Sequence, residues 1–285
     1  MMGVEARIVI WHADGEVAER AAVAAYDRLG ELNRILSDYQ VDSELNVLCD
    51  RAGQGAIPIS GDLFAVLHRA QEFAQASDGA FDVTIGPLSR LWREARGRGR
   101  PPTSEQVEAA RALVDWRRLT LDPSTRTARL DTPGMKLDLG GIGKGYAVAE
   151  ARHELILRDC QSCLVELGGD VAFGDPPPGT DGWTMLLPAR DGSSRSERLV
   201  LSNVVVSTSG DSVQYLEWEG QRYSHIIDPR TGWGVRNMAH VVVIARDGMT
   251  SDALASTISV LGGVEVNSLL SRLGVGPDVR VIILD

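Results

Sequence analysis

Hydrophobic positions recur with helical spacing in much of the first part of the chain, while alternation is limited to short segments. Alternation over Arg7–Trp11 predicts a strand near the start. Ser60 is a suitable N-cap for the second of three predicted helices, and Arg96–Pro102 is rich in Gly, Arg and Pro, which predicts a linker. The predicted helices are Glu16–Leu36, Asp62–Ala76 and Ser104–Leu113.

Short strands dominate the second part of the chain, interrupted by two helices over Lys144–Arg158 and Ser251–Leu261. Strands at this spacing with segregated helices favour an α+β fold. A length of 285 residues allows one large domain or two small ones. The predicted strands are Leu119–Leu121, Ala128–Leu130, Met135–Leu137, Cys163–Leu167, Trp183–Leu187, Arg198–Leu201, Val204–Ser207, Val241–Ala245 and Arg280–Leu284.

Composition narrows the classes of function. A net charge of −10 argues against a nucleic-acid partner, which normally requires a basic face. An acidic protein that binds a diphosphate needs a local cation, a lysine or a set of backbone N–H groups. No apolar run approaches the roughly 18 residues of a membrane helix, so no transmembrane segment is predicted. The start has no leader-like pattern, which leaves a cytoplasmic protein or a removed targeting segment.

The three cysteines include the pair Cys160 and Cys163, which has redox or half-zinc spacing. No second CxxC or nearby HxxxH follows, so a zinc site is not supported. The favoured interpretation is two small residues around the start of a strand.

A glycine-rich segment runs from Asp138 to Tyr146 and joins a predicted strand to a helix. This arrangement presents backbone N–H groups to a phosphate. The segment matches neither a P-loop nor the dinucleotide GxGxxG motif. A tight turn with a surface lysine is the alternative, and glycines beside Asp138 and Lys144 favour an anion site over it.

Three further segments carry candidate chemistry, each with a structural alternative. His225 is a candidate general base, with Asp228 as a group that could orient it; an Asx-Pro turn with a structural histidine is the alternative. Asp252 and Ser256 lie four residues apart on one helix face and offer oxygen ligands to magnesium, although an acid at a helix N-terminus is common in any case. The third segment, Val165–Asp170, runs from a predicted strand into two glycines that would let the backbone pass close to a ligand. A simple turn at the end of the strand explains it equally well.

Taken together and in order, these segments resemble the ApbE family of FAD:protein FMN transferases over essentially the whole chain. No single motif is decisive, but eight in order are specific. The matching segments are Met2-Gly3-Val4, Tyr39 with Ser43-Glu44-Leu45, Gly79–Leu88 with Leu91-Trp92, Asp138–Ala147, Gly168-Gly169-Asp170, Thr208–Asp211, His225–Gly232 and Ser251–Gly262.

The resemblance implies one ApbE-like (T-fold-related) α+β domain over residues 1–285, with antiparallel sheets, segregated helices, an α-rich part at 12–115 and a β-rich part at 116–285. It implies that Mg²⁺ is held by the backbone carbonyl of Gly141 and by Asp252 and Ser256. It also implies a set of residues that contact FAD, the substrate. These are Met2 and Tyr39 at the adenine, Ala80, Phe81 and Asp82 along the FAD, Asp138 and Lys144 at the cofactor, and Ile227 near the flavin.

The activity implied is magnesium-dependent transfer of FMN from FAD to a Thr or Ser of a target protein, an electron-transfer flavoprotein, with release of AMP. In this scheme His225 takes the hydroxyl proton and Asp228 orients it. Hydrolysis of FAD to FMN and AMP is a second possibility, and a non-catalytic FAD-binding protein is a third. The family's usual setting indicates the cell envelope or periplasm, with the cytoplasm as the alternative.

Three residues depart from the family pattern. Val4 stands in place of Thr, Gly143 in place of Ala before the lysine, and Ser256 in place of Thr as metal ligand. Serine keeps the oxygen and loses the methyl group that restrains χ1, so we expect magnesium binding to be retained.

Overall fold

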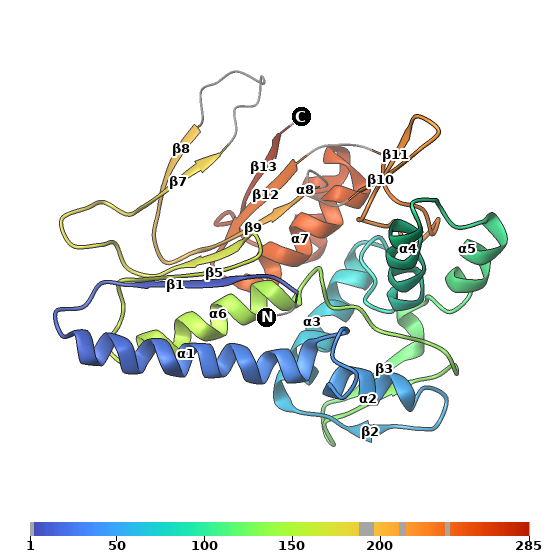
Figure 1. Cartoon of the computed structure of the whole chain (residues 1–285), viewed down its shortest axis with the longest axis horizontal. Helices are drawn as coiled ribbons and strands as arrows, with labels where there is room; N and C mark the ends of the chain where they lie inside the picture. Colours follow the sequence, from blue (N-terminus) through green and yellow to red (C-terminus); the bar gives the residue numbers. More distant parts are fainter. Residues whose placement is uncertain (1–2, 188–196, 211–214, 237–239, 285) are drawn as a thin grey trace.

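A six-stranded antiparallel sheet forms the centre of the computed structural model, which describes residues 3–187, 197–210, 215–236 and 240–284 (Figure 1). The first strand of the chain pairs with β5, so segments far apart in the sequence lie side by side. In sheet order the strands are β1 (Ala6–Ile10), β5 (Cys163–Leu167), β6 (Asp170–Phe173), β9 (Val205–Ser209), β12 (His240–Ala245) and β13 (Arg280–Leu284).

Three helices cover one face of this sheet: α1 (Gly15–Leu36), α6 (Gly143–Ile156) and α7 (Gly248–Leu261) (Figure 1). The alternation of strand side chains divides the core, because successive residues point to opposite faces. Val241 and Val243 belong to the cluster shared with the helices, whereas the intervening Val242 and the following Ile244 belong to a second cluster.

A hairpin of β7 (Trp183–Leu187) and β8 (Glu197–Leu201) contributes to that second cluster. Leu187 and Leu199 of the hairpin are buried there together with Val206 and Val242 of the main sheet. The sheet therefore has apolar partners on both faces.

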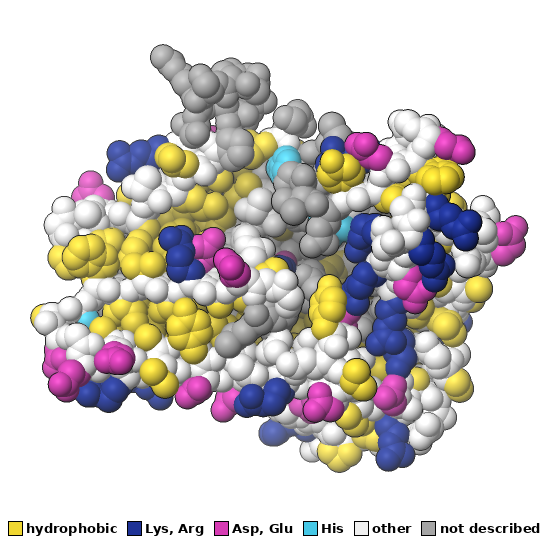
Figure 2. Space-filling view, in the orientation of Figure 1, with side chains coloured by type: hydrophobic (Ala, Val, Ile, Leu, Met, Phe, Trp, Pro, Cys, Tyr) yellow, Lys and Arg dark blue, Asp and Glu magenta, His cyan; other side chains and the backbone are white. Residues whose placement is uncertain are grey.

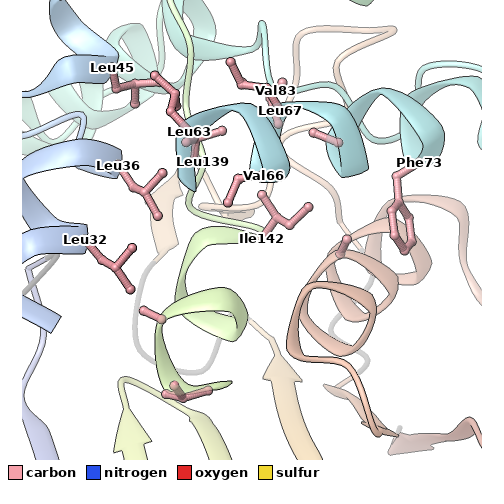
Figure 3. Close-up of a cluster of buried hydrophobic side chains, with 14 of the residues drawn as sticks. Leu32, Leu36, Leu45, Leu63, Val66, Leu67, Phe73, Val83, Leu139 and Ile142 are labelled. Carbon is pink, nitrogen blue, oxygen red and sulfur yellow. The ribbon is translucent and has the colours of Figure 1, made fainter. Parts of the chain in front are cut away.

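A smaller layer packs against the ends of α1 and α6. Its helix α3 (Gly61–Ala76) begins at Ser60, whose Oγ accepts a hydrogen bond from Leu63 N at 3.2 Å. In Figure 3, Leu32 and Leu36 from α1 approach α3, and Ile142 lies beneath it. The other elements of this layer are α2 (Glu44–Asp50), the three-stranded sheet β2 (Ile57–Pro58), β4 (Thr127–Leu130) and β3 (Leu119–Asp122), and the 3-10 turn η1 (Trp116–Arg118).

A third apolar cluster joins α4 (Gly86–Arg98) and α5 (Ser104–Arg111) to the hairpin of β10 (Tyr215–Trp218) and β11 (Gln221–Ser224). Trp92 is fully buried at its centre, and its indole N–H donates to Gly232 O at 2.8 Å. The C-terminal part adds η2 (Gly263–Glu265) and α8 (Val266–Arg272).

The predicted α+β class with antiparallel sheets is confirmed. Two local predictions are wrong. Met135–Leu137 forms no strand, since only Lys136 makes an isolated bridge, to Ile85. The predicted linker Arg96–Pro102 begins inside α4, which ends at Arg98 and is capped by Gly99 in the left-handed conformation, φ 69°. Among the described residues, no helix is both long and apolar enough to cross a membrane.

Candidate active site at the start of helix α6

The glycine-rich segment forms a tight turn that leads into α6. Asp138 anchors it: its N–H donates to Val83 O at 2.8 Å, and its Oδ1 accepts from Gly140 N at 2.8 Å. Lys144, in the first turn of α6, reaches back and donates to Gly140 O at 2.9 Å. The turn therefore holds Asp138 and Lys144 on the same short loop.

Lys144 lies between two buried carboxylates that come from different elements. Its Nζ is 3.0 Å from Asp170 Oδ2, at the start of β6, and 3.3 Å from Asp252 Oδ2, in α7. The N–H of Gly145 also donates to Asp252 Oδ2 at 3.0 Å. The other oxygen of Asp170, Oδ1, is buried without a hydrogen-bond partner among the described residues.

The negative charges of Asp170 and Asp252 repel each other. Burial, followed by the charge of Asp170, raises the pKa of Asp252 to about 7, although Lys144 and the Gly145 N–H oppose the shift. Burial lowers the pKa of Lys144, but the charges of Asp170 and Asp252 outweigh it and hold that pKa above its usual value. The cluster thus has more negative than positive charge and favours a further cation.

The starts of α6 and α7 touch through their backbones. A Cβ on Gly145 would lie 2.0 Å from Gly248 O and 2.8 Å from the Cβ of Asp252. No side chain fits in that space. The close approach brings the first turn of α6, with Lys144, against the helix face that carries Asp252.

We expect Gly145→Ala to lower the FMN transfer that the resemblance implies by at least about a hundredfold, because a displacement of about 1 Å can cost that much. The added methyl group has to push α7 away, which also destabilises the fold by about 1–3 kcal/mol. Steady-state transfer and urea unfolding measure the two effects. Gly143→Ala is the matched control, since its Cβ would meet no atom closer than Leu139 Cβ at 3.6 Å; equal losses in both variants would contradict the role of the helix contact.

The three residues expected to hold magnesium are neighbours. A Cβ on Gly141 would lie 2.8 Å from Ser256 Oγ and 3.3 Å from Phe81 Cε2, so the turn packs directly on α7. Ser256 follows Asp252 by one helical turn and shares its face. Asp252 and Ser256 together offer a carboxylate and a hydroxyl beside the Gly141 backbone.

These residues fit a magnesium ion. All the donors are hard oxygens. The two carboxylates already bind one positive charge, that of Lys144. The buried Oδ1 of Asp170 lacks a hydrogen-bond partner among the described residues. The described part of the chain holds no group of three or more His, Cys, Asp or Glu side chains arranged for a metal. A site with one protein carboxylate agrees with this, because magnesium usually keeps waters and substrate phosphates as its other ligands.

Ala80, Phe81 and Asp82 form a buried loop next to this turn. Asp82 Oδ1 accepts from Thr84 N and Oγ1 at 2.8 and 2.7 Å, and its Oδ2 accepts from Trp116 N at 2.9 Å. Burial raises the pKa of Asp82 to about 6 against these bonds. Asp82 therefore shapes the loop, and its contact with FAD stays a prediction.

Tyr39 is linked to Asp138 through Arg93. Tyr39 is 60% exposed, and the guanidinium carbon of Arg93 lies 4.2 Å from the centroid of its ring. Arg93 Nη2 is 2.7 Å from Asp38 Oδ2 and 4.0 Å from Asp138 Oδ2. Contacts thus run continuously from Tyr39 through Arg93 and Asp138 to the Lys144 turn.

The His225 loop follows β11. His225 is half-buried, and Ile227 is buried in the cluster of Trp92. Asp228 Oδ1 accepts from Arg230 N and Nε, both at 2.9 Å, and its Oδ2 accepts from Arg230 Nη2 at 2.9 Å. Asp228 is thus paired within its own turn, and its role toward His225 stays a prediction.

A pocket of about 460 Å³ is lined by both this loop and α7. Its lining includes Asp228 and Trp233 from the loop and Val260 from the helix. Val260 lies one turn beyond Ser256 on the face that also carries Asp252. The loop therefore borders the same helix as the candidate metal site.

The structure brings together Asp138, Gly141, Lys144, Asp252 and Ser256, and links Tyr39 to them. Met2 lies outside the described residues. Three side chains at the site were not among the predicted site residues: Asp170, Asp38 and Arg93. A signal existed for Asp170, because two glycines precede an acid at the end of a predicted strand. Nothing in the sequence around Asp38 and Arg93 indicated that these two residues belong to the site.

The chain matches the family model described as "ApbE family" over residues 2–280. It is 31% identical to FAD:protein FMN transferase of Vibrio cholerae over 92% of this chain and 79% of the relative. It is 34% identical to the protein of that name from Haemophilus influenzae, over 82% and 70%.

Solved structures agree with the sequence relatives. A mutant of the flavin transferase ApbE from Vibrio cholerae superimposes with a TM-score of 0.86 at 28% identity, covering 99% of this chain and 91% of the other. The ApbE protein of Thermotoga maritima gives 0.85 at 28% identity with the same coverage. The fold, the ordered motifs and the family match over nearly the whole chain agree: this chain belongs to the ApbE family.

Proposed function

We propose that this chain is a magnesium-dependent FAD:protein FMN transferase that attaches FMN to a Ser or Thr of an acceptor protein and releases AMP. The observation that carries the proposal is the Lys144 cluster, in which a lysine and two buried carboxylates meet at a glycine-rich turn. The relatives named FAD:protein FMN transferase support the same activity.

Gly141, Asp252 and Ser256 would hold the magnesium ion. When bound, the ion supplies positive charge that stabilises the diphosphate as its bond breaks. Lys144 adds a second cation at the same place, so this acidic protein can hold an anionic substrate. Tyr39 offers an aromatic surface to the adenine, while Asp138 keeps the turn in shape.

In the proposed reaction the acceptor hydroxyl oxygen bonds to the FMN phosphorus. The phosphorus–oxygen bond to AMP breaks, and AMP leaves with the electron pair of that bond. The hydroxyl proton passes to His225, whose imidazole can accept it near neutral pH. Asp228 is proposed to orient the ring.

We expect His225→Gln to lower FMN transfer by about 10²–10⁴-fold, the usual contribution of a general base. FAD affinity should stay within about twofold, because the histidine acts on the acceptor hydroxyl. Single-turnover transfer and FAD fluorescence quenching measure the two quantities. Full transfer by the variant would remove His225 from the mechanism. His153→Gln, in the last turn of α6, is the control.

The test of the activity is incubation with FAD, with and without magnesium, in the presence of a Thr-containing acceptor peptide. Magnesium-dependent AMP release with flavin bound covalently to the peptide would establish the transferase. AMP with free FMN would point to an FAD pyrophosphatase, and unchanged bound FAD would indicate a non-catalytic FAD-binding protein. We further propose an electron-transfer flavoprotein as acceptor and the cell envelope as the place of action.

A further inference from the structure

Three arginines recur at every third position of α4: Arg90, Arg93 and Arg96. Residues with this spacing lie close together on a helix surface. Arg90 donates to Asn46 Oδ1 at 3.1 Å, and Arg93 pairs with Asp38 at 2.7 Å. Figure 2 shows Lys and Arg side chains gathered over the part of the surface that α4 and α5 form.

Arg96 differs from the other two. It is half-buried, and among the described residues it has no carboxylate within ion-pair distance. Burial, followed by the charge of Arg93, lowers its pKa. A guanidinium is rarely withdrawn from water beside a second one unless an anion compensates it. Arg96 therefore calls for a negative group that the described residues do not supply.

The position of Arg96 identifies that group. Arg96 follows Arg93 by three residues on α4, so the two side chains share one helix surface. The guanidinium carbon of Arg93 lies 4.2 Å from the centroid of the Tyr39 ring, and Tyr39 is 60% exposed. Arg93 also connects this ring to Asp138 and the Lys144 turn. An aromatic face beside a guanidinium that has no carboxylate partner among the described residues suits a planar base joined to a phosphate.

We propose that Arg96, with Arg93 beside it, binds the phosphate of the adenylate half of FAD and of released AMP. Asp38 holds Arg93 in place against Tyr39, and Arg96 supplies the uncommitted fork of N–H donors. Lys144 then acts on the diphosphate from the other side of the Asp138 turn. The inference rests on the proposed function, because it assigns residues to the leaving group of that reaction.

Calorimetric titration of the full chain with AMP and with adenosine, without FAD, tests the inference. We expect Arg96→Gln to weaken AMP binding about tenfold, which is the value of a charge-assisted hydrogen bond, and to leave adenosine binding unchanged. Arg96→Lys should recover part of the affinity for AMP. Arg98→Gln is the matched control, because Arg98 lies on the same helix and is paired with Glu94 at 2.6 Å.

Equal losses for AMP and adenosine would overturn the inference, as would unchanged AMP binding or no AMP binding by the unsubstituted protein. The transfer assay keeps this result apart from the proposed function. FMN transfer by a protein whose AMP affinity does not depend on Arg96 refutes the inference alone. Arg96-dependent AMP binding by a protein that transfers no FMN refutes the function alone.

Discussion

Asp252→Ala should abolish the proposed magnesium-dependent FMN transfer, with a loss on the order of a thousandfold or more. Asp252 is the single carboxylate of the expected metal site. Its Oδ2 also receives the N–H of Gly145 at 3.0 Å. The substitution thus removes a metal ligand and a bond that fixes the start of α6. The measurements are AMP release with and without magnesium, and magnesium binding by calorimetry.

Two further variants separate the effect of the charge at the expected metal site from the effect of side-chain shape. Asp252→Asn keeps the size of the side chain and removes its charge, so we expect it to lose magnesium binding as well. Ser256→Thr keeps the oxygen and adds a methyl group that restrains χ1, so we expect it to bind magnesium at least as well as the unsubstituted chain. Full activity of Asp252→Ala would rule out Asp252 as a metal ligand.

Lys144→Met should lower the free energy of unfolding by about 3–5 kcal/mol near neutral pH, the usual cost of breaking a buried ion pair. Asp170 and Asp252, with side chains 2% and 6% exposed, lose their shared cation. Added Mg²⁺ should restore part of the stability, because an ion held at the proposed site would bind the folded state alone. Urea unfolding with and without Mg²⁺ measures both effects.

The loss should depend on pH. The pKa of Asp252 is already raised to about 7 by burial and by Asp170, and removing Lys144 raises it further. A carboxyl group whose folded-state pKa exceeds its unfolded value destabilises the fold as pH rises through the folded pKa. The deficit relative to the unsubstituted chain should therefore grow as pH rises above about 7 and shrink as pH falls back to that value. Lys144→Met/Asp170→Asn should be more stable than the single variant; an equally unstable double variant would contradict the charge explanation.

The sequence predicted the long helices well, because their apolar spacing and caps are local. The periodicity that predicted Glu16–Leu36 corresponds to α1. The helix α4 was missed because tertiary contacts decide it. It begins with the pair Gly86-Pro87, and its arginine-rich end was predicted to be a linker, whereas the burial of Trp92 on the same helix appears only in the fold. Met135 and Leu137, which were predicted to lie in a strand, are apolar because their side chains are buried in the core.

In the candidate site, too, some groupings follow from the sequence and others only from the fold. Asp138 and Lys144 share one short motif, and Asp252 and Ser256 share one helix face, so their grouping follows from sequence spacing. The contact between Lys144 and Asp170 spans a helix and a strand. The stacking of Arg93 on Tyr39 joins α4 to the loop between α1 and α2, which only the packed fold brings together.

The pairing of β1 with β5 has a practical consequence for handling this protein. Gly3 lies beside the ring of Tyr39, where a Cβ would be 3.9 Å from Tyr39 Cε2, and Val4 packs on Gly168. β13 lies at the other edge of the sheet. A purification tag joined ahead of Gly3 would therefore start beside Tyr39, the residue proposed to contact the adenine, whereas one joined after β13 would start at the opposite edge of the sheet (Figure 1).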